Sequence, residues 1–126
     1  MPAVKQKVLL VEDDPFMATL LSQELAKEGF EVLLATNGEE ALKNFKDSKP
    51  DALVLDILLP RRTGLEVLRD IRGLDGGADV PVVVLSNLEE ASYIRDAEEL
   101  GVKAYLIKAN VQLAEIVAKV KEALKR

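Results

Sequence analysis

The chain has 126 residues, of which 48% are hydrophobic and 31% are charged, a mix that is typical of one soluble globular domain. Its net charge of −5 argues against a general nucleic-acid or membrane-surface binder, and the lack of cysteine and histidine excludes disulfides, imidazole zinc sites and Ser-His or Cys-His nucleophile pairs. The start of the chain has no apolar signal segment, and no run approaches the roughly 20 apolar residues that span a bilayer. We therefore expect a cytoplasmic protein without membrane insertion.

Five short apolar runs alternate with longer amphipathic segments along the chain. The runs are continuous rather than alternating, which is typical of strands that are buried on both faces of a parallel sheet. They are Val8–Val11, Val32–Ala35, Leu53–Leu55, Val82–Leu85 and Tyr105–Ile107.

The segment after the first run carries helix signals. Asp14 predicts a structural N-cap, and Pro15 suits the first helical position behind it. Gly29 is well placed to end this helix. Its predicted apolar face consists of Phe16, Leu20, Leu21 and Leu25.

Similar signals predict four more helices. Asn37–Glu40 and Asn87–Glu90 each have an Asn followed three residues later by Glu, and Thr63–Glu66 fits a capping box. Gly101 closes the fourth helix, and the fifth follows Asn110. The apolar stripe of the fifth helix is Leu113, Ile116, Val117, Val120 and Leu124. Between the third helix and the fourth run, the segment 74–79 contains a Gly pair and predicts a loop.

Strands that alternate with helices predict an α/β fold with a five-stranded parallel sheet and helices on both faces. The predicted architecture is a doubly wound, flavodoxin-like (βα)5 sandwich with strand order 2-1-3-4-5. We expect a single domain over residues 1–126, with 1–6 as a loose N-terminal tail.

Charged side chains follow the ends of three of the predicted strands. Glu12 and Asp13 follow the first, Asp56 follows the third and Lys108 follows the fifth, while Ser86 ends the fourth. Because ligands of such sheets bind at the carboxyl ends of the strands, these groups would meet at one edge. Clustered carboxylates need a compensating charge, and their hard oxygens suit Mg²⁺. An aspartate, a metal, an ammonium and a hydroxyl are what in-line phosphoryl transfer needs.

From Val8 through the final helix, the chain resembles the receiver domain of two-component response regulators. Four segments carry the resemblance, in the family's order and on the expected strands. They are Val11–Pro15, Leu53–Pro60 followed by Gly64, Val82–Ser86 and Ala104–Lys108.

The resemblance implies a role for each site residue. Asp56 would be the phosphoacceptor and a metal ligand, Asp13 would bind Mg²⁺ directly, Glu12 would do so largely through water, and the backbone carbonyl of Leu58 would add a ligand. The phosphoryl-binding residues would be Ser86 and Lys108, and the switch residues would be Ser86 and Tyr105. Without the resemblance, the position of Tyr105 on a buried strand predicts a core residue whose hydroxyl reaches the surface.

The resemblance also implies a function. A histidine kinase, a phosphotransfer protein or a small acyl or phosphoramidate donor would phosphorylate Asp56 in the presence of Mg²⁺. The phosphorylated chain would present the face made by the fourth helix, fifth strand and fifth helix to a downstream protein target, with no direct nucleic-acid contact. We expect a monomer or weak dimer, and no enzyme activity beyond assistance to its own phosphorylation and dephosphorylation.

The sequence departs from the family pattern at three places. Ala109 follows Lys108 where the family usually has a proline with a cis bond, Asn87 stands where a smaller residue is common, and Val102–Ala104 replaces the usual acidic residues. The first departure is the main support for an alternative hypothesis, a phosphorylation-independent protein-interaction module.

Other hypotheses have less support. A dehalogenase-type hydrolase needs a second Asp where Leu58 stands, and a flavodoxin-like cofactor carrier needs a phosphate-cradling loop after the first strand. Four arginines around the third helix are interpreted as a solvated face, with a docking patch as the alternative; they are Arg61, Arg62, Arg69 and Arg72.

Overall fold

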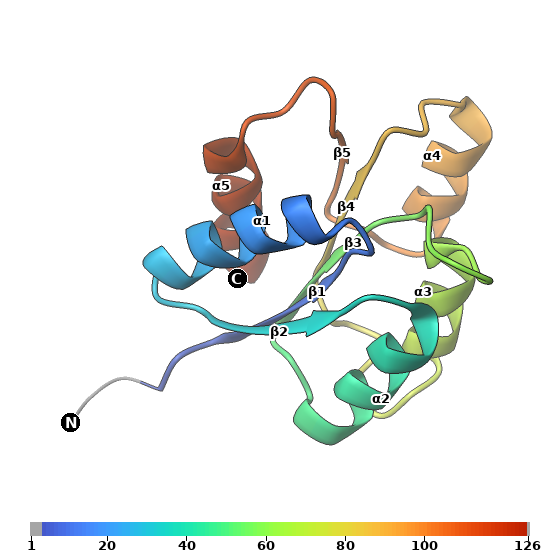
Figure 1. Cartoon of the computed structure of the whole chain (residues 1–126). Helices are drawn as coiled ribbons and strands as arrows, with labels where there is room; N and C mark the ends of the chain where they lie inside the picture. Colours follow the sequence, from blue (N-terminus) through green and yellow to red (C-terminus); the bar gives the residue numbers. More distant parts are fainter. Residues whose placement is uncertain (1–3, 126) are drawn as a thin grey trace.

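The structure is a computed structural model that describes residues 4–125. Positions 1–3 of the predicted tail lie outside the described residues, and residues 4–6 form no helix or strand. The strands are β1 (Lys7–Val11), β2 (Glu31–Ala35), β3 (Ala52–Leu55), β4 (Val82–Ser86) and β5 (Ala104–Ile107). The helices are α1 (Pro15–Lys27), α2 (Gly38–Ser48), α3 (Gly64–Arg72), α4 (Ala91–Glu99) and α5 (Leu113–Leu124) (Figure 1).

The strands form one parallel sheet in the order β2-β1-β3-β4-β5, as predicted. At the centre, Val11 of β1 pairs with Ala35 of β2 on one side and with Leu55 of β3 on the other. The first and third strands are therefore neighbours, and the chain that leaves each of them emerges at the same edge of the sheet.

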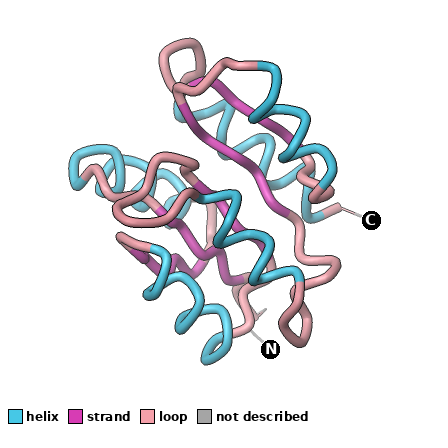
Figure 2. Tube along the Cα trace, turned by 90° about the vertical axis from the view of Figure 1, so that its right-hand side faces the viewer, coloured by secondary structure: helices cyan, strands magenta, loops and turns pink. Residues whose placement is uncertain are grey.

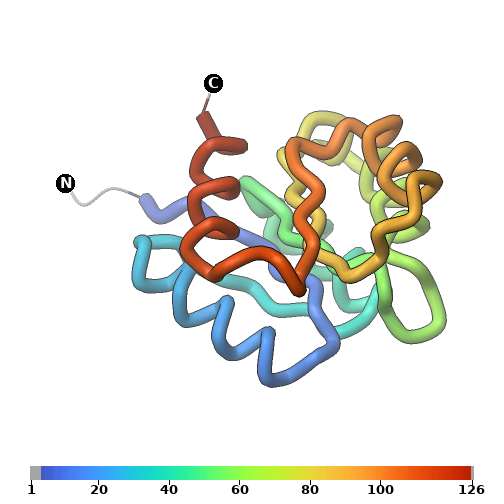
Figure 3. Tube along the Cα trace, turned by 90° about the horizontal axis from the view of Figure 1, so that it is seen from above, coloured from blue at the N-terminus to red at the C-terminus, as the bar shows by residue number. Residues whose placement is uncertain are grey.

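Helices cover both faces of this sheet, which lies between them in Figure 2. One core cluster joins β1, β3 and β4 to α1 and α5, through residues such as Leu21 and Ile116. The other joins the opposite face to α2, α3 and α4, through residues such as Phe45 and Leu68. Figure 3 shows α1 and α5 together on one side, away from α4. The doubly wound sandwich predicted from the sequence is confirmed.

Burial on both faces, which the continuous apolar runs predict for all five strands, holds for β3 and β4 and for most of β1. It is wrong for the edge strands, because β5 is half-buried throughout and Leu34 of β2 is 45% exposed. An edge strand has a neighbour on one side only, so the helices above the centre of the sheet do not cover it fully.

The predicted caps are confirmed for the first three helices. Oδ1 of Asp14 accepts the N–H of Phe16 at 2.9 Å, Oδ1 of Asn37 accepts that of Glu40 at 2.9 Å, and Thr63 forms the capping box of α3. Gly29 and Gly101 have positive φ values of 93° and 77° just after α1 and α4, as predicted for residues that end helices.

Two local predictions are wrong. The fourth helix begins at Ala91 behind Glu90, which makes no side-chain capping bond, so Asn87 does not open it. Phe16 is 73% exposed, whereas Ala18 and Leu21 of the same helix are buried. At about 100° per residue, Phe16 lies nearly opposite Ala18 on α1, which places it away from the core.

Candidate functional site

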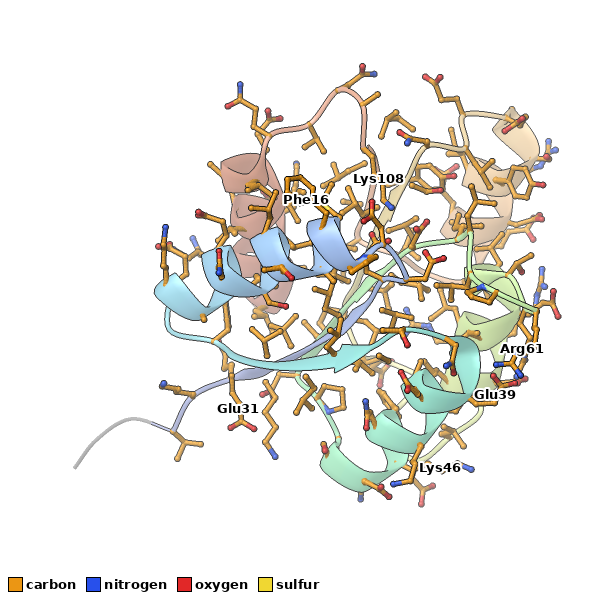
Figure 4. All side chains as sticks on the ribbon, in the orientation of Figure 1. Phe16, Glu31, Glu39, Lys46, Arg61 and Lys108 are labelled. Atoms are coloured by element: carbon orange, nitrogen blue, oxygen red, sulfur yellow. The ribbon has the colours of Figure 1, made fainter. Side chains whose placement is uncertain are left out.

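The groups predicted to meet at the carboxyl edge of the sheet come from adjacent strands. Glu12 follows β1 and Asp56 follows β3, and the last residues of these strands, Val11 and Leu55, are paired. Ser86 ends β4 and is paired with the last residue of β5, so Lys108 follows directly beside it. In Figure 4, Lys108 lies at the centre of this edge, near the start of α1.

Glu12, Asp13 and Asp56 form an acidic cluster. One carboxylate oxygen from each lies within 4.8 Å of the others. Glu12 and Asp56 are only 1% and 4% exposed, whereas Asp13 is open to solvent. Three hard oxygen donors, one of them facing water, fit Mg²⁺, which binds a few carboxylates and keeps several waters.

Backbone groups fix the orientation of the two buried carboxylates. The N–H of Asp14 donates to Oε2 of Glu12 at 3.1 Å, and the N–H of Leu58 donates to Oδ1 of Asp56 at 3.1 Å. The turn that supplies the second bond depends on Gly64, because a Cβ there would lie 2.2 Å from the carbonyl oxygen of Asp56. Gly64 therefore allows α3 to start against the backbone of the site.

Lys108 forms ion pairs with both buried carboxylates. Its Nζ lies 2.8 Å from Oε1 of Glu12 and 2.8 Å from Oδ2 of Asp56. Burial alone would lower the pKa of Lys108, but its hydrogen bonds with Asp56 and Glu12 and their negative charges raise that pKa above its usual value. Lys108 is therefore charged at neutral pH, and the sequence did not reveal its contact with Glu12.

Burial also affects the pKa of Glu12. Burial raises the pKa of Glu12, and the negative charge of Asp56 adds to this, although the bonds from Lys108 and Asp14 oppose the rise. Its charged form is thus disfavoured even beside the ammonium of Lys108.

Ser86 and Tyr105 both contact the loop between β4 and α4. Oγ of Ser86 accepts the N–H of Leu88 at 3.3 Å, and the hydroxyl of Tyr105 donates to the carbonyl of Leu88 at 2.6 Å. Tyr105 is half-buried, and burial raises the pKa of its hydroxyl. The two residues predicted as a switch therefore hold the same residue of one loop.

Asn87 and Ala109, two of the departures from the family pattern, contact each other. The N–H of Ala109 donates to Oδ1 of Asn87 at 3.0 Å. No cis peptide bond occurs in residues 4–125, so the bond between Lys108 and Ala109 is trans. The ammonium of Lys108 nevertheless reaches Asp56. Sequence reasoning missed the contact between Asn87 and Ala109. The one signal for it was that these two unusual residues follow neighbouring strands.

The four arginines do not form one solvated face. Arg61 and Arg69 are exposed and Arg62 pairs with Asp70, but Arg72 is half-buried. Nε of Arg72 donates to the carbonyl of Leu100 at 2.8 Å, and its Nη1 donates to the carbonyls of Gly77 and Val80, in the loop between α3 and β4, at 2.9 and 2.7 Å. Arg72 thus has a structural role, which corrects the prediction for this residue.

Comparison with known proteins gives one consistent answer. Residues 8–121 match the response regulator receiver domain family. The chain is 42% identical to the transcriptional regulatory protein PrrA of Mycobacterium leprae over 120 residues, which are 95% of this chain and 50% of that protein. It thus spans about half the length of this curated relative.

Solved structures agree. The receiver domain protein (CheY-like) of Methanospirillum hungatei has a TM-score of 0.89 at 25% identity, with 96% of this chain and 94% of that chain covered. The receiver domain of the sensor histidine kinase PA1611 of Pseudomonas aeruginosa, solved with a magnesium ion in its active-site cleft, has a TM-score of 0.85 at 27% identity, with 96% and 98% covered.

No helix among residues 4–125 has the length and apolar character needed to cross a bilayer.

The match over residues 8–121, the strand order and the acidic edge of the sheet all point to one family. This chain belongs to the response regulator receiver domains of two-component systems.

Proposed function

We propose that this chain is a phosphoryl-accepting switch in which Asp56 is the phosphoacceptor. The observation that carries the proposal is the position of Asp56, buried between the acidic residues after β1 and the ammonium of Lys108. A lone carboxylate at a strand end would not need either. Perturbed, charged groups that converge at the switch point of a parallel sheet are typical of a functional site.

The proposed reaction forms a bond between a carboxylate oxygen of Asp56 and the phosphorus of the donor. With a phosphohistidine donor, the P–N bond breaks and its electron pair returns to the imidazole nitrogen. With an acyl phosphate, the P–O bond breaks and the pair leaves with the carboxylate of the donor. In both cases Asp56 reacts as its anion, and no proton has to be removed from it.

The residues at the site fit Mg²⁺. Asp13 and Asp56 would bind it directly, Glu12 largely through water, and the backbone carbonyl of Leu58 would complete the protein ligands. When bound, Mg²⁺ supplies positive charge that offsets the charge on the transferred phosphoryl group. The magnesium in the receiver domain of PA1611, 27% identical to this chain, supports this assignment.

Lys108 and Ser86 would bind the oxygens of the phosphoryl group. Lys108 already contacts Asp56, and its charge would stabilise the added negative charge. Ser86 contributes a hydroxyl at the end of β4, the strand beside β3. If Ser86 turns toward the phosphoryl group, it releases the N–H of Leu88, and the loop that Tyr105 also holds can rearrange.

The output would be a changed protein-binding face on α4, β5 and α5. A histidine kinase or phosphotransfer protein is the proposed donor and a protein the proposed target. We propose no direct contact with nucleic acid, a monomer or weak dimer, and no enzyme activity beyond assistance to its own phosphorylation and dephosphorylation. Of the residues of α4, only Ala97 is buried, and such sparse packing supports a helix that can shift.

The alternative of a phosphorylation-independent interaction module has lost its main support. That hypothesis rests on Ala109 in place of proline, which would displace the ammonium of Lys108. The ammonium lies 2.8 Å from Asp56 beside a trans peptide bond.

A direct experiment tests the proposed function. The chain is incubated with acetyl phosphate and Mg²⁺, and its intact mass is recorded together with that of Asp56→Asn, which keeps the size of the side chain. We expect the mass of one phosphoryl group on the wild type and none on the variant. Equal labelling of both chains, or no labelling of either, would contradict the proposal.

Amide spectra with beryllofluoride and Mg²⁺ test the switch separately. We expect shifts at Ser86 and Tyr105 in the wild type but not in Asp56→Asn. Phosphorylation without these shifts would support an acceptor whose output uses another face.

A further inference from the structure

The loops that follow β4 and β5 are joined by hydrogen bonds beyond the last paired residues of the sheet. The N–H of Lys108 donates to the carbonyl of Ser86 at 3.0 Å. One position further along both loops, the N–H of Ala109 donates to Oδ1 of Asn87 at 3.0 Å. The side chain of Asn87 thus extends the pairing of β4 and β5 by one step, at the point where the site begins.

This second bond depends on both residue types. Position 109 offers an N–H only because it is not proline, and the trans bond before Ala109 leaves that N–H directed at Asn87. Position 87 must carry an acceptor on a short side chain, which alanine lacks. The two departures from the family pattern are therefore the donor and the acceptor of one hydrogen bond.

The bond lies next to the residue that holds the charge of the site together. A lysine side chain has four rotatable bonds, so a fixed backbone reduces the conformational freedom that it loses when its ammonium contacts two carboxylates. The backbone of Lys108 is held by its own N–H on Ser86 and by the N–H of Ala109 on Asn87. We propose that Asn87 is a positioning residue, which acts through Ala109 to keep the ammonium of Lys108 between Glu12 and Asp56.

A second consequence concerns movement. The loop that contains Asn87 is also held by Tyr105, through the carbonyl of Leu88. Because Asn87 ties this loop to Ala109, a rearrangement of the loop also moves the backbone of Lys108. This coupling rests on the function proposed above, whereas the positioning of Lys108 in the resting chain does not.

The positioning can be measured by NMR on the full chain, without phosphoryl donor or Mg²⁺. The readouts are hydrogen exchange of the Ala109 amide and the protection of the Lys108 ammonium protons. In Asn87→Ala we expect the Ala109 amide to exchange about tenfold faster, the change that corresponds to the loss of one net hydrogen bond. The ammonium protons of Lys108 should lose protection as well.

Two variants control for a general loss of stability. Asn87→Asp keeps an oxygen in the same place and should restore the protection of Ala109. Asn37→Ala makes the same substitution at another asparagine that accepts one backbone N–H, at 2.9 Å, and should leave Lys108 unchanged. Unchanged Lys108 protons in Asn87→Ala, or an equal effect of Asn37→Ala, would overturn the proposal.

Ala109→Pro tests the bond from the donor side. In that background no N–H remains for Asn87, so Asn87→Ala should have no further effect on the Lys108 ammonium. Equal effects of Asn87→Ala with and without the proline would show that Asn87 acts by another route.

Phosphorylation is then measured separately. We expect Asn87→Ala to slow the labelling of Asp56 by acetyl phosphate severalfold. Asn87→Asp is compared by NMR only, because it adds a charge. A wild type that takes no phosphoryl group would contradict the proposed function and leave the NMR result for Lys108 intact.

Discussion

The two halves of the site are held in place by different means. The acidic half contains Glu12, Asp13 and Asp56. Its two buried carboxylates, Glu12 and Asp56, lie at the ends of β1 and β3, central strands that are covered on both faces. The loop half consists of residues 87–90 and 108–110, which follow β4 and β5, and the side chains of Ser86, Asn87 and Tyr105 each hold it by one hydrogen bond.

This difference separates two tasks. A buried carboxylate cannot move without losing its partners, and an unpaired buried charge is costly. A single hydrogen bond near the surface contributes about 1 kcal/mol, and water can replace it. We therefore expect the acidic half to keep its geometry and the loop half to change.

Removal of the Lys108 ammonium should have the largest effect on stability. In Lys108→Met, Glu12 and Asp56 lose the ammonium that lies 2.8 Å from each. We expect the free energy of unfolding, measured with urea in metal-free buffer at neutral pH, to fall by about 3 kcal/mol.

Lys103→Met is the matched control, because Lys103 is exposed at the opposite end of β5. Its unfolding free energy should stay within about 0.5 kcal/mol of the wild type. If both variants lose equally little, the buried carboxylates do not depend on Lys108.

Glu12→Gln should stabilise the metal-free chain. Burial raises the pKa of Glu12, so between the unfolded and folded pKa values the folded chain binds more protons than the unfolded chain. Stability therefore falls as the pH rises through this interval. Without the charge, we expect a melting temperature a few degrees above the wild type at pH 7.5, and a smaller difference near pH 4.

The test is a pair of melting curves at each pH with a chelator present. A lower melting temperature for Glu12→Gln at pH 7.5 would mean that its bond with Lys108 outweighs burial. Added Mg²⁺ should raise the melting temperature of the wild type more than that of the variant, because the variant lacks one carboxylate.

The sequence predicted the acidic half well for a physical reason. The ends of buried parallel strands can be located from apolar runs, and all such ends meet at one edge of the sheet. Once Val11 and Leu55 were recognised as strand ends, Glu12 and Asp56 had to be neighbours.

The loop half could not be predicted in the same way. The pattern from Asn87 to Glu90 is that of a helix cap, which is a local signal, but the side chain of Asn87 binds Ala109, 22 residues away. Phe16 fails for a related reason, since apolar spacing alone does not say which side of α1 faces the sheet. Contacts between distant loops leave no periodic trace in a sequence.

Asp14→Ala should separate the cap from the metal site. Oδ1 of Asp14 accepts the N–H groups of Phe16 and Met17 at 2.9 and 3.4 Å. We expect a loss of about 1 kcal/mol in the free energy of unfolding, because the first turn of α1 loses its cap.

The Mg²⁺-dependent rise in melting temperature should be the same in Asp14→Ala as in the wild type. Asp13→Ala, one residue earlier, is the contrasting variant and should reduce that rise, since Asp13 belongs to the acidic cluster. A reduced response in Asp14→Ala would place Asp14 among the metal ligands.

Tyr105→Phe should have the smallest effect on stability. It deletes the hydroxyl that donates to the carbonyl of Leu88 at 2.6 Å and keeps the ring. Because Tyr105 is half-buried and water can reach the loop, we expect a loss of about 0.5 kcal/mol in urea unfolding.

The double variant Tyr105→Phe/Asn87→Ala then distinguishes a loop that is held as a unit from two independent contacts. The two bonds involve adjacent residues of one loop, Leu88 and Asn87, so once either bond is gone, the other orders a loop that is already partly free. The double variant should therefore lose less free energy of unfolding than the sum of the two single losses. Strict additivity would mean that the two hydrogen bonds stabilise the fold independently.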